Sequence, residues 1–117
     1  MRFVVLLAVV LLAGCAGVLE REPQLRWLEG GRPAYPASAK AAGVEGYAVV
    51  EYRVDVEGRV RDPRVVEAVP AGVFDAAALA AIRSWRYQPF DDGAGVRAVD
   101  GVRSRFDFQL GEAYPGL

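Results

Sequence analysis

The sequence offers few side chains that could perform catalysis or hold a metal ion. It contains no histidine and one cysteine, Cys15, whereas metal sites need clusters of histidine or cysteine, and nucleophilic catalysis needs a serine or cysteine beside a base. Carboxylates remain, and the only adjacent pair is Asp91 and Asp92, in a glycine-rich stretch. Such a pair acts as acid and base only where a pocket buries it. We predict no enzyme, no cofactor and no metal, with an enzyme built on Asp91 and Asp92 as the alternative.

The composition is that of a chain that folds into one domain. Of the 117 residues, 53% are hydrophobic and 25% are charged, which supplies enough apolar side chains for a core and excludes a disordered chain. The formal net charge is −1, so the chain lacks the basic surface that nucleic acid requires. We therefore exclude a nucleic-acid partner.

The first residues have the pattern of an export signal. An uncharged run over residues 3–19 contains Leu12-Ala13-Gly14-Cys15, and small residues before a lone cysteine resemble the lipobox of bacterial lipoproteins. This resemblance implies a signal peptide over residues 1–14, a lipid on Cys15 and a periplasmic location, with the outer membrane favoured because Ala16 is not the aspartate of an inner-membrane retention signal. Alternatively, the run stays uncleaved as an inner-membrane signal anchor, since it is at the lower limit of spanning length.

Residues 15–31 show no sustained periodicity, and we predict that they tether the lipidated cysteine to a domain over residues 32–111. Fully extended, this tether reaches about 60 Å at most. Residues 112–117 form a short tail. Three apolar residues of the tether can pack on the domain: Leu25, Trp27 and Leu28.

A short helix and a strand open the domain. Pro36 suits the first turn of a helix over residues 37–42, and Gly43 suits the position after its end. Residues 46–56 then alternate between apolar and largely polar side chains. This is the period of a strand that buries one face.

The next strand turns back on the first. Glu57-Gly58 supplies the residue with positive φ that a tight reversal needs, and residues 59–69 form the second strand. Pro63 lies inside it, and a proline cannot donate a hydrogen bond to a ladder. We therefore expect the second strand at an edge of the sheet, or bulged at Pro63.

A second helix and a third strand complete the domain. Apolar residues recur at helical spacing from Phe74 to Trp85, and Pro89 closes this segment. From Val102 to Leu110 the side chains alternate again, with apolar or small ones inward and charged or polar ones outward. This pattern predicts a half-buried strand with a wet outer face.

The directions of the three strands limit the topology. The second strand runs opposite to the first and the third runs parallel to the second, so antiparallel neighbours require the third to lie beside the first. The prediction is an α+β fold with a three-stranded antiparallel sheet of order 2-1-3 and two helices packed on one face. The third strand carries no proline, and its unpaired edge is a template for another chain.

A series of short motifs runs through the predicted domain. They are Arg32-Pro33-Ala34-Tyr35-Pro36, Val44-Glu45-Gly46, Glu57-Gly58-Arg59-Val60, Pro70-Ala71-Gly72-Val73-Phe74-Asp75, Trp85-Arg86-Tyr87-Gln88-Pro89 and the alternating last strand. In their order and spacing they resemble the TonB C-terminal domain family. The resemblance implies a protein-binding module of the periplasm that is associated with TonB-dependent transmembrane transport.

The resemblance implies a structural role for most signature residues, namely Tyr35, Pro36, Gly46, Gly58, Phe74, Trp85, Tyr87 and Pro89. In the family, a short transporter segment called the TonB box adds to the sheet beside the last strand. The corresponding residues here are Arg103, Ser104, Arg105, Phe106, Asp107, Phe108 and Gln109. Arg32, before the first proline of Pro-x-Tyr-Pro, corresponds to a further partner contact. The implied partner is an outer-membrane transporter or another envelope protein with such a segment.

Other interpretations stay open. Arg103 and Arg105 either pair with acidic residues of a partner or form an ordinary solvated face. The edge of the last strand can also pair with itself, which would make the protein a homodimer or a passive structural lipoprotein. We do not expect energy transduction by this chain alone, because the sequence shows neither the proline-rich spacer nor the motor-engaging helix of a TonB-type transducer.

Overall fold

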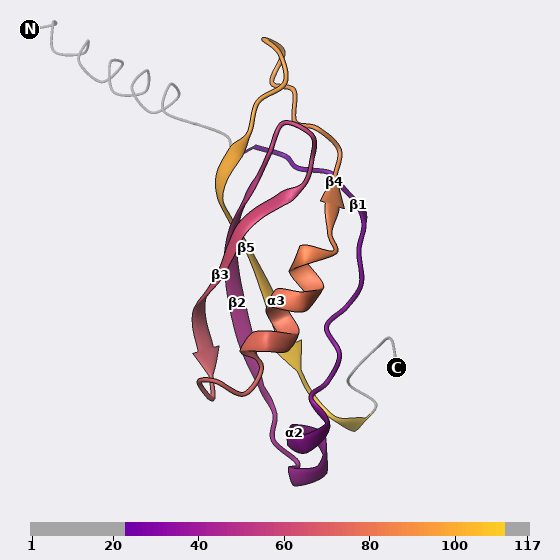
Figure 1. Ribbon diagram of the computed structural model, residues 1–117, viewed down its shortest axis with the longest axis vertical. Coiled ribbons are helices and arrows are strands. Elements are labelled where there is room, and N and C mark those ends of the chain that lie inside the picture. The colour runs from indigo at the N-terminus through magenta and orange to yellow at the C-terminus, as the bar shows by residue number, and fades with distance from the viewer. Residues whose placement is uncertain (1–22, 112–117) are drawn as a thin grey trace, which may run out of the picture.

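The computed structural model describes residues 23–111, which form a small antiparallel sheet with helices against it (Figure 1). The predicted signal peptide, Cys15 and the tail over 112–117 lie outside the described residues. Lipidation of Cys15 therefore stays a prediction. Within the described part of the chain, no helix is both long enough and apolar enough to cross a membrane.

Three strands form the main sheet, in the predicted order. β2 (Gly46–Val54) lies between β3 (Val60–Val69) and β5 (Val99–Phe108), and both pairings are antiparallel. The central strand buries alternate side chains, which are Ala48, Val50, Tyr52 and Val54. This is the alternation that the sequence predicted, and the α+β fold is confirmed.

The carboxylate of Asp55 holds the turn between β2 and β3. Its Oδ1 accepts the backbone N–H groups of Glu57 at 2.8 Å and of Arg59 at 2.9 Å. Gly58 has a φ of 86°, in the left-handed region that glycine favours, and a Cβ there would lie 1.9 Å from the carbonyl oxygen of Tyr87. Because the turn uses these residues, both strands are slightly shorter than predicted.

The outer strand β3 is bulged at Pro63. Its pairing partners on β2 skip from Glu51 to Arg53, so Asp62 and Pro63 together stand opposite one residue. Asp62 has a φ of 50°, which bends the strand locally. The sequence predicted an edge or a bulge at this proline, and β3 is both.

Two helices accompany the sheet. α2 (Ala37–Ala42) has its predicted bounds and ends at Gly43, whose φ is 73°. α3 (Asp75–Arg83) lies on one face of the sheet, roughly along the strands, and contacts β2 and β3, while α2 lies beyond one end of β2 (Figure 1). Ala39 of α2 is buried in the same core as α3.

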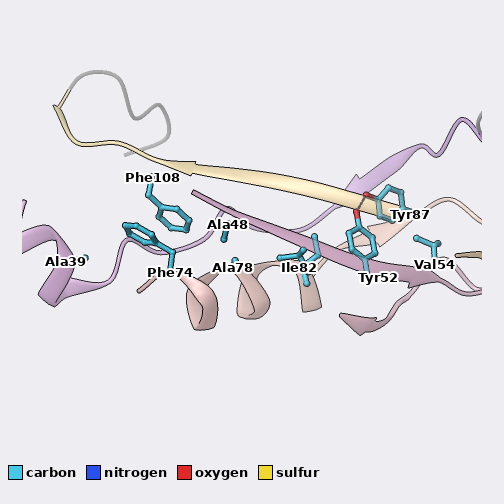
Figure 2. Close-up of a cluster of buried hydrophobic side chains, with 10 residues drawn as sticks. Ala39, Ala48, Tyr52, Val54, Phe74, Ala78, Ile82, Tyr87 and Phe108 are labelled. Atoms are coloured by element: carbon cyan, nitrogen blue, oxygen red, sulfur yellow. Dashed lines mark hydrogen bonds between the residues drawn. The ribbon is translucent and has the colours of Figure 1, made fainter. Parts of the chain in front are cut away.

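The core has an aromatic end and a hydrogen-bonded end (Figure 2). At the first, the rings of Phe74 and Phe108 stack with their centroids 4.2 Å apart, and both meet the ring of Tyr35 edge to face. At the second, the hydroxyl groups of Tyr52 and Tyr87 lie 2.6 Å apart. Because burial opposes ionisation, it raises the pKa of the Tyr52 hydroxyl.

A small second sheet corrects the predicted extent of the tether. β1 (Trp27–Glu29) pairs antiparallel with β4 (Arg86–Tyr87), and the backbone N–H of Gln88 donates to the carbonyl oxygen of Arg26 at 2.8 Å. Leu25 packs against the core. Part of the segment assigned to a tether is therefore integral to the fold, and a strand of three residues is too short to produce a recognisable period.

Candidate polypeptide-docking site

The outer edge of β5 is open in the described part of the chain. β2 is the only strand paired with β5 there, so the backbone groups on the other side of β5 have no ladder partner. From Val102 to Phe108 the pairing with β2 is regular, and its one irregularity lies earlier, at Gly101 with a φ of 69°. This stretch can accept another strand.

A groove of about 640 Å³ follows the second half of this edge. β5 supplies one wall, and the segment from Trp27 to Pro33 supplies the other, with Trp85 between them. We call it the β5 groove. Its lining residues are Trp27, Gly30, Gly31, Arg32, Pro33, Trp85, Arg105, Phe106, Asp107 and Gln109.

Trp85 fixes the far wall of the β5 groove. Its indole Nε1–H donates to the carbonyl oxygen of Gly31 at 2.9 Å, and the backbone N–H of Gly31 donates to Ser84 Oγ at 3.1 Å. The Trp85 ring also meets Trp27 and Phe106 edge to face, with centroids 6.0 and 5.5 Å away. The groove is thus lined by aromatic rings, and a hydrogen bond fixes the central one, Trp85.

Close packing explains the glycine at the start of this wall. Gly30 has a φ of 141°, and a Cβ built there would lie 2.3 Å from Cδ1 of Trp85. Any larger residue would push the wall away from the indole ring. The segment therefore lies against Trp85 only because position 30 has no side chain.

The first half of the β5 edge has a different neighbour. Pro23 and Leu25 line a second hollow together with the start of β5, from Val99 to Arg103. Residues just after the described N-terminus therefore flank this half of the edge. The more clearly bounded groove is the one beside Arg105 to Gln109.

Charged side chains cover the outward face of β5. Arg103 Nε lies 3.0 Å from Glu51 Oε2, and the same carboxylate is bound by Arg64 of β3. The hydrogen bonds from Arg64 and then from Arg103 hold the pKa of Glu51 below its usual range. One carboxylate thus serves two guanidinium groups, which leaves an excess positive charge beside β5.

Arg105 is held differently. Its guanidinium lies over the Tyr47 ring, 3.8 Å from the centroid, and its Nε lies 3.0 Å from Asp107 Oδ1. The stacking and the ion pair keep this side chain along the sheet, at the rim of the β5 groove.

The predicted docking residues of β5 divide between its two faces. Ser104, Phe106 and Phe108 face inward; Ser104 Oγ lies 2.8 Å from the Tyr52 hydroxyl, and Phe108 is fully buried. Arg103, Arg105, Asp107 and Gln109 are exposed. The structure places Arg32 in the same groove as Arg105 to Gln109. Phe108 serves the core, which leaves the edge itself and the inward Phe106 for contact with a partner.

The residues expected to be structural lie in or beside the core. Tyr35, Phe74 and Tyr87 pack there, and Trp85 packs against it. Pro36 precedes α2, and Pro89 follows β4. A Cβ on Gly46 would lie 1.8 Å from the carbonyl oxygen of Val69. Trp85 has a second role that its helical spacing does not indicate, because it also lines the β5 groove.

Trp27, Gly30 and Gly31 are groove residues that the sequence did not indicate as a site. They were assigned to the tether. The available signal was Trp27, a large aromatic residue outside any periodic element, which remains 49% exposed. An exposed tryptophan beside an open strand edge is typical of a binding surface.

Asp91 and Asp92 shape a turn and are not a catalytic acid–base pair. Both are exposed, and Asp91 Oδ1 accepts the N–H groups of Gly93 at 2.8 Å and of Gly95 at 3.2 Å. The N–H of Ala94 and the side chain of Arg97 bind Asp92 and hold its pKa below the usual range. The alternative of an enzyme built on these carboxylates is therefore wrong. Residues 23–111 contain no cluster of three or more histidine, cysteine or acidic residues that could hold a metal.

Comparisons with known proteins agree with this fold. The model of the family "Gram-negative bacterial TonB protein C-terminal" matches residues 31–110. Protein TonB of Escherichia coli is 38% identical over 71 residues, which are 61% of this chain and 30% of that protein. Protein TonB of Yersinia enterocolitica is 42% identical over 57 residues, which are 49% of this chain and 22% of that protein.

A solution NMR structure of the Pseudomonas aeruginosa TonB C-terminal domain is also similar. It superposes with a TM-score of 0.65 at 29% identity and covers 79% of this chain and 92% of that one. The chain spans less than a third of the two curated TonB proteins, yet it covers nearly all of this isolated domain. With the family model matched from residue 31 to 110, the chain belongs to the TonB C-terminal family.

Proposed function

We propose that this domain docks a strand-forming segment of another envelope protein, of the TonB-box kind, and that it does so in TonB-dependent transport. The observation that carries the proposal is the coincidence of two features: the unpaired edge of β5 from Val102 to Phe108 and the β5 groove beside it. A segment that enters the groove meets backbone donors and acceptors on one side and aromatic rings on the other.

Strand addition explains how such a segment would be held. An added strand lies about 4.8 Å from β5 and exchanges backbone hydrogen bonds with it. About five or six such bonds, at roughly 0.5–1.5 kcal/mol each, give about 3–9 kcal/mol. Association costs about 4–15 kcal/mol. The two ranges are similar in size, so backbone pairing alone gives weak binding at best. Contacts with Trp27, Trp85 and Phe106 add to it, and the docking is reversible.

We place the domain in the periplasm, anchored by a lipid on Cys15. The support is the lipobox-like sequence before Cys15 and the lack of any other cysteine that could oxidise outside the cytoplasm. Metabolic labelling with a fatty acid tests this anchor. Labelling of the natural chain but not of a Cys15→Ala variant is expected. If neither chain is labelled, the alternative of an uncleaved signal anchor is favoured.

The docking proposal is tested by titrating the isotope-labelled full chain in detergent with a TonB-box peptide, while the backbone amides are followed by NMR. We expect the largest shifts along β5 and in the Trp85 indole N–H, which faces the groove wall. Amides of β3, at the opposite edge, serve as the internal control. Unmoved β5 amides at millimolar peptide would overturn the proposal.

The second candidate is self-association through the same edge, as in a homodimer or a passive structural lipoprotein. The open edge of β5 is the observation in its favour, because a second copy can pair there. Sedimentation of the chain over a wide concentration range separates the two. A monomer at all concentrations removes the homodimer.

A further inference from the structure

The two faces of β5 present different chemistry to a docked strand. Successive side chains of a strand point to opposite faces, so an added strand places one set beside Arg103 and Arg105 and the other set toward Phe106. The first set lies on the wet face of the sheet. The second set enters the β5 groove between Trp27 and Trp85.

We propose that the docked segment carries an acidic side chain beside Arg103 and, on its other face, apolar side chains that enter the β5 groove. This inference rests on the proposed docking along β5 and names the chemistry of the partner. Charge complementarity carries the acidic half, and the aromatic lining carries the apolar half.

Arg103 is the guanidinium that can change partners most easily. It shares the Glu51 carboxylate with Arg64, so Glu51 keeps one cation when Arg103 turns to a partner. The group of Arg64, Glu51 and Arg103 carries a net charge of plus one. An acidic side chain next to β5 neutralises that excess without leaving a carboxylate unpaired.

Arg105 offers less to an acid, because Asp107 already neutralises it at 3.0 Å and the Tyr47 ring holds its guanidinium. An acidic residue placed beside Asp107 would meet a like charge. The outward face of β5 is therefore polarised: it favours an acid near Arg103 and disfavours one near Asp107. This difference gives the docked segment a preferred register.

The inward side of the docked segment meets mainly aromatic rings, with Arg32 further along the far wall of the β5 groove. Phe106 and Trp85 lie edge to face at 5.5 Å, and Trp27 closes the other side of the β5 groove. Branched or aromatic side chains gain by leaving water between these rings, whereas an acid placed between them would lose hydration. An acid beside Arg103, with apolar residues on the other face of the segment, thus satisfies both faces at once.

Two heptapeptide probes test the inference on the full chain in detergent. One alternates glutamate and valine, the other glutamine and valine, so they differ in charge and keep the same shape. At low salt we expect the glutamate probe to bind roughly three- to tenfold more tightly, the range for one or two exposed ion pairs. Arg103→Gln should remove most of this preference and Arg105→Gln less of it. Arg61→Gln, on the same face but at the β3 edge, is the matched control.

The outcomes separate the two proposals. Equal affinity for the two probes, with β5 amides shifted by both, overturns the acidic pattern and leaves strand docking intact. A glutamate preference that persists in Arg103→Gln overturns the assignment to Arg103. If neither probe shifts the β5 amides, the docking proposal falls and the partner chemistry falls with it.

Discussion

The two edge strands of the main sheet differ in how regularly they present their unpaired backbone groups. β3 carries Pro63 and an extra residue at Asp62, and its pairing with β2 is irregular at a second place, between Val49 and Val50. From Val102 to Phe108, β5 has neither a proline nor a bulge. Since a regular free edge invites association, one edge of this sheet is blocked and the other is left able to pair.

The open edge of β5 also differs from that of β3 in having a neighbouring segment that bounds it. Trp27 to Pro33 runs beside it and is tied to Trp85 through Gly31. A flat edge would accept any extended chain, whereas a walled one accepts a segment of limited width. In the proposed docking, selectivity at β5 comes from the wall, whereas the bulge at β3 interrupts the other edge.

The largest expected effect comes from detaching β5 from the core. Phe108 is fully buried and stacks on Phe74, so Phe108→Ala should lower the free energy of unfolding by about 3–5 kcal/mol. Urea denaturation measures it. Phe106→Ala, at a half-buried position of the groove, should lower the free energy of unfolding less than Phe108→Ala does. It should weaken peptide binding more. A loss below about 1 kcal/mol for Phe108→Ala would mean that β5 is held mainly by its ladder with β2.

The next effect concerns the wall. Trp85→Phe keeps an aromatic ring but removes the N–H that donates to Gly31, and we expect the free energy of unfolding to fall by about 1 kcal/mol. Peptide affinity should fall several-fold, because the wall moves. Trp27→Phe keeps every hydrogen bond and is the control. Equal affinity losses for the two variants would show that ring size, and not the fixed wall, governs docking.

The contrast between the edges could largely be predicted from the sequence. Period-two alternation in β2 and β5, helical spacing before Trp85 and the proline inside β3 each follow from local backbone geometry. Antiparallel pairing then left one sheet order. These features are encoded within a few residues of each other, and the structure has them where they were expected.

The wall of the β5 groove could not be predicted, because it depends on contacts between distant residues. Trp85 and Gly31 are 54 positions apart, and β1 and β4 are too short to show a period. The pairing with β4, the hydrogen bonds of Gly31 and the packing of Gly30 against the indole ring together place this segment. Which edge is open was therefore predictable, and what bounds it was not.

A smaller effect on stability is expected as the pH falls. Hydrogen bonds from Arg64 and Arg103 hold the pKa of Glu51 below its usual range, so the carboxylate stabilises the fold above its ordinary pKa, and this contribution is lost as the pH falls through the lowered value. Glu51→Gln should lower the Tm at pH 7 slightly and flatten its decline below about pH 4.5. Asp107→Asn, which removes a carboxylate of the same face that has one arginine partner, is the matched control. If the Tm of Glu51→Gln declines at low pH as steeply as that of the natural chain, the Glu51 carboxylate does not stabilise the fold by joining β3 and β5.

The smallest change in stability, and the sharpest test of the comparison, lies at β3. Pro63→Val restores one backbone donor, yet the extra residue still interrupts the edge, so we expect a monomer whose free energy of unfolding changes by about 0.5 kcal/mol or less. Deleting Asp62 as well places the new valine opposite Tyr52 and makes the edge regular from Val60 to Val65, and sedimentation should then show concentration-dependent association. If Pro63→Val alone associates, the proline and not the bulge protects β3. If the double variant stays monomeric, a regular edge is not enough for pairing, and the groove beside β5 becomes the feature that makes that edge a docking site.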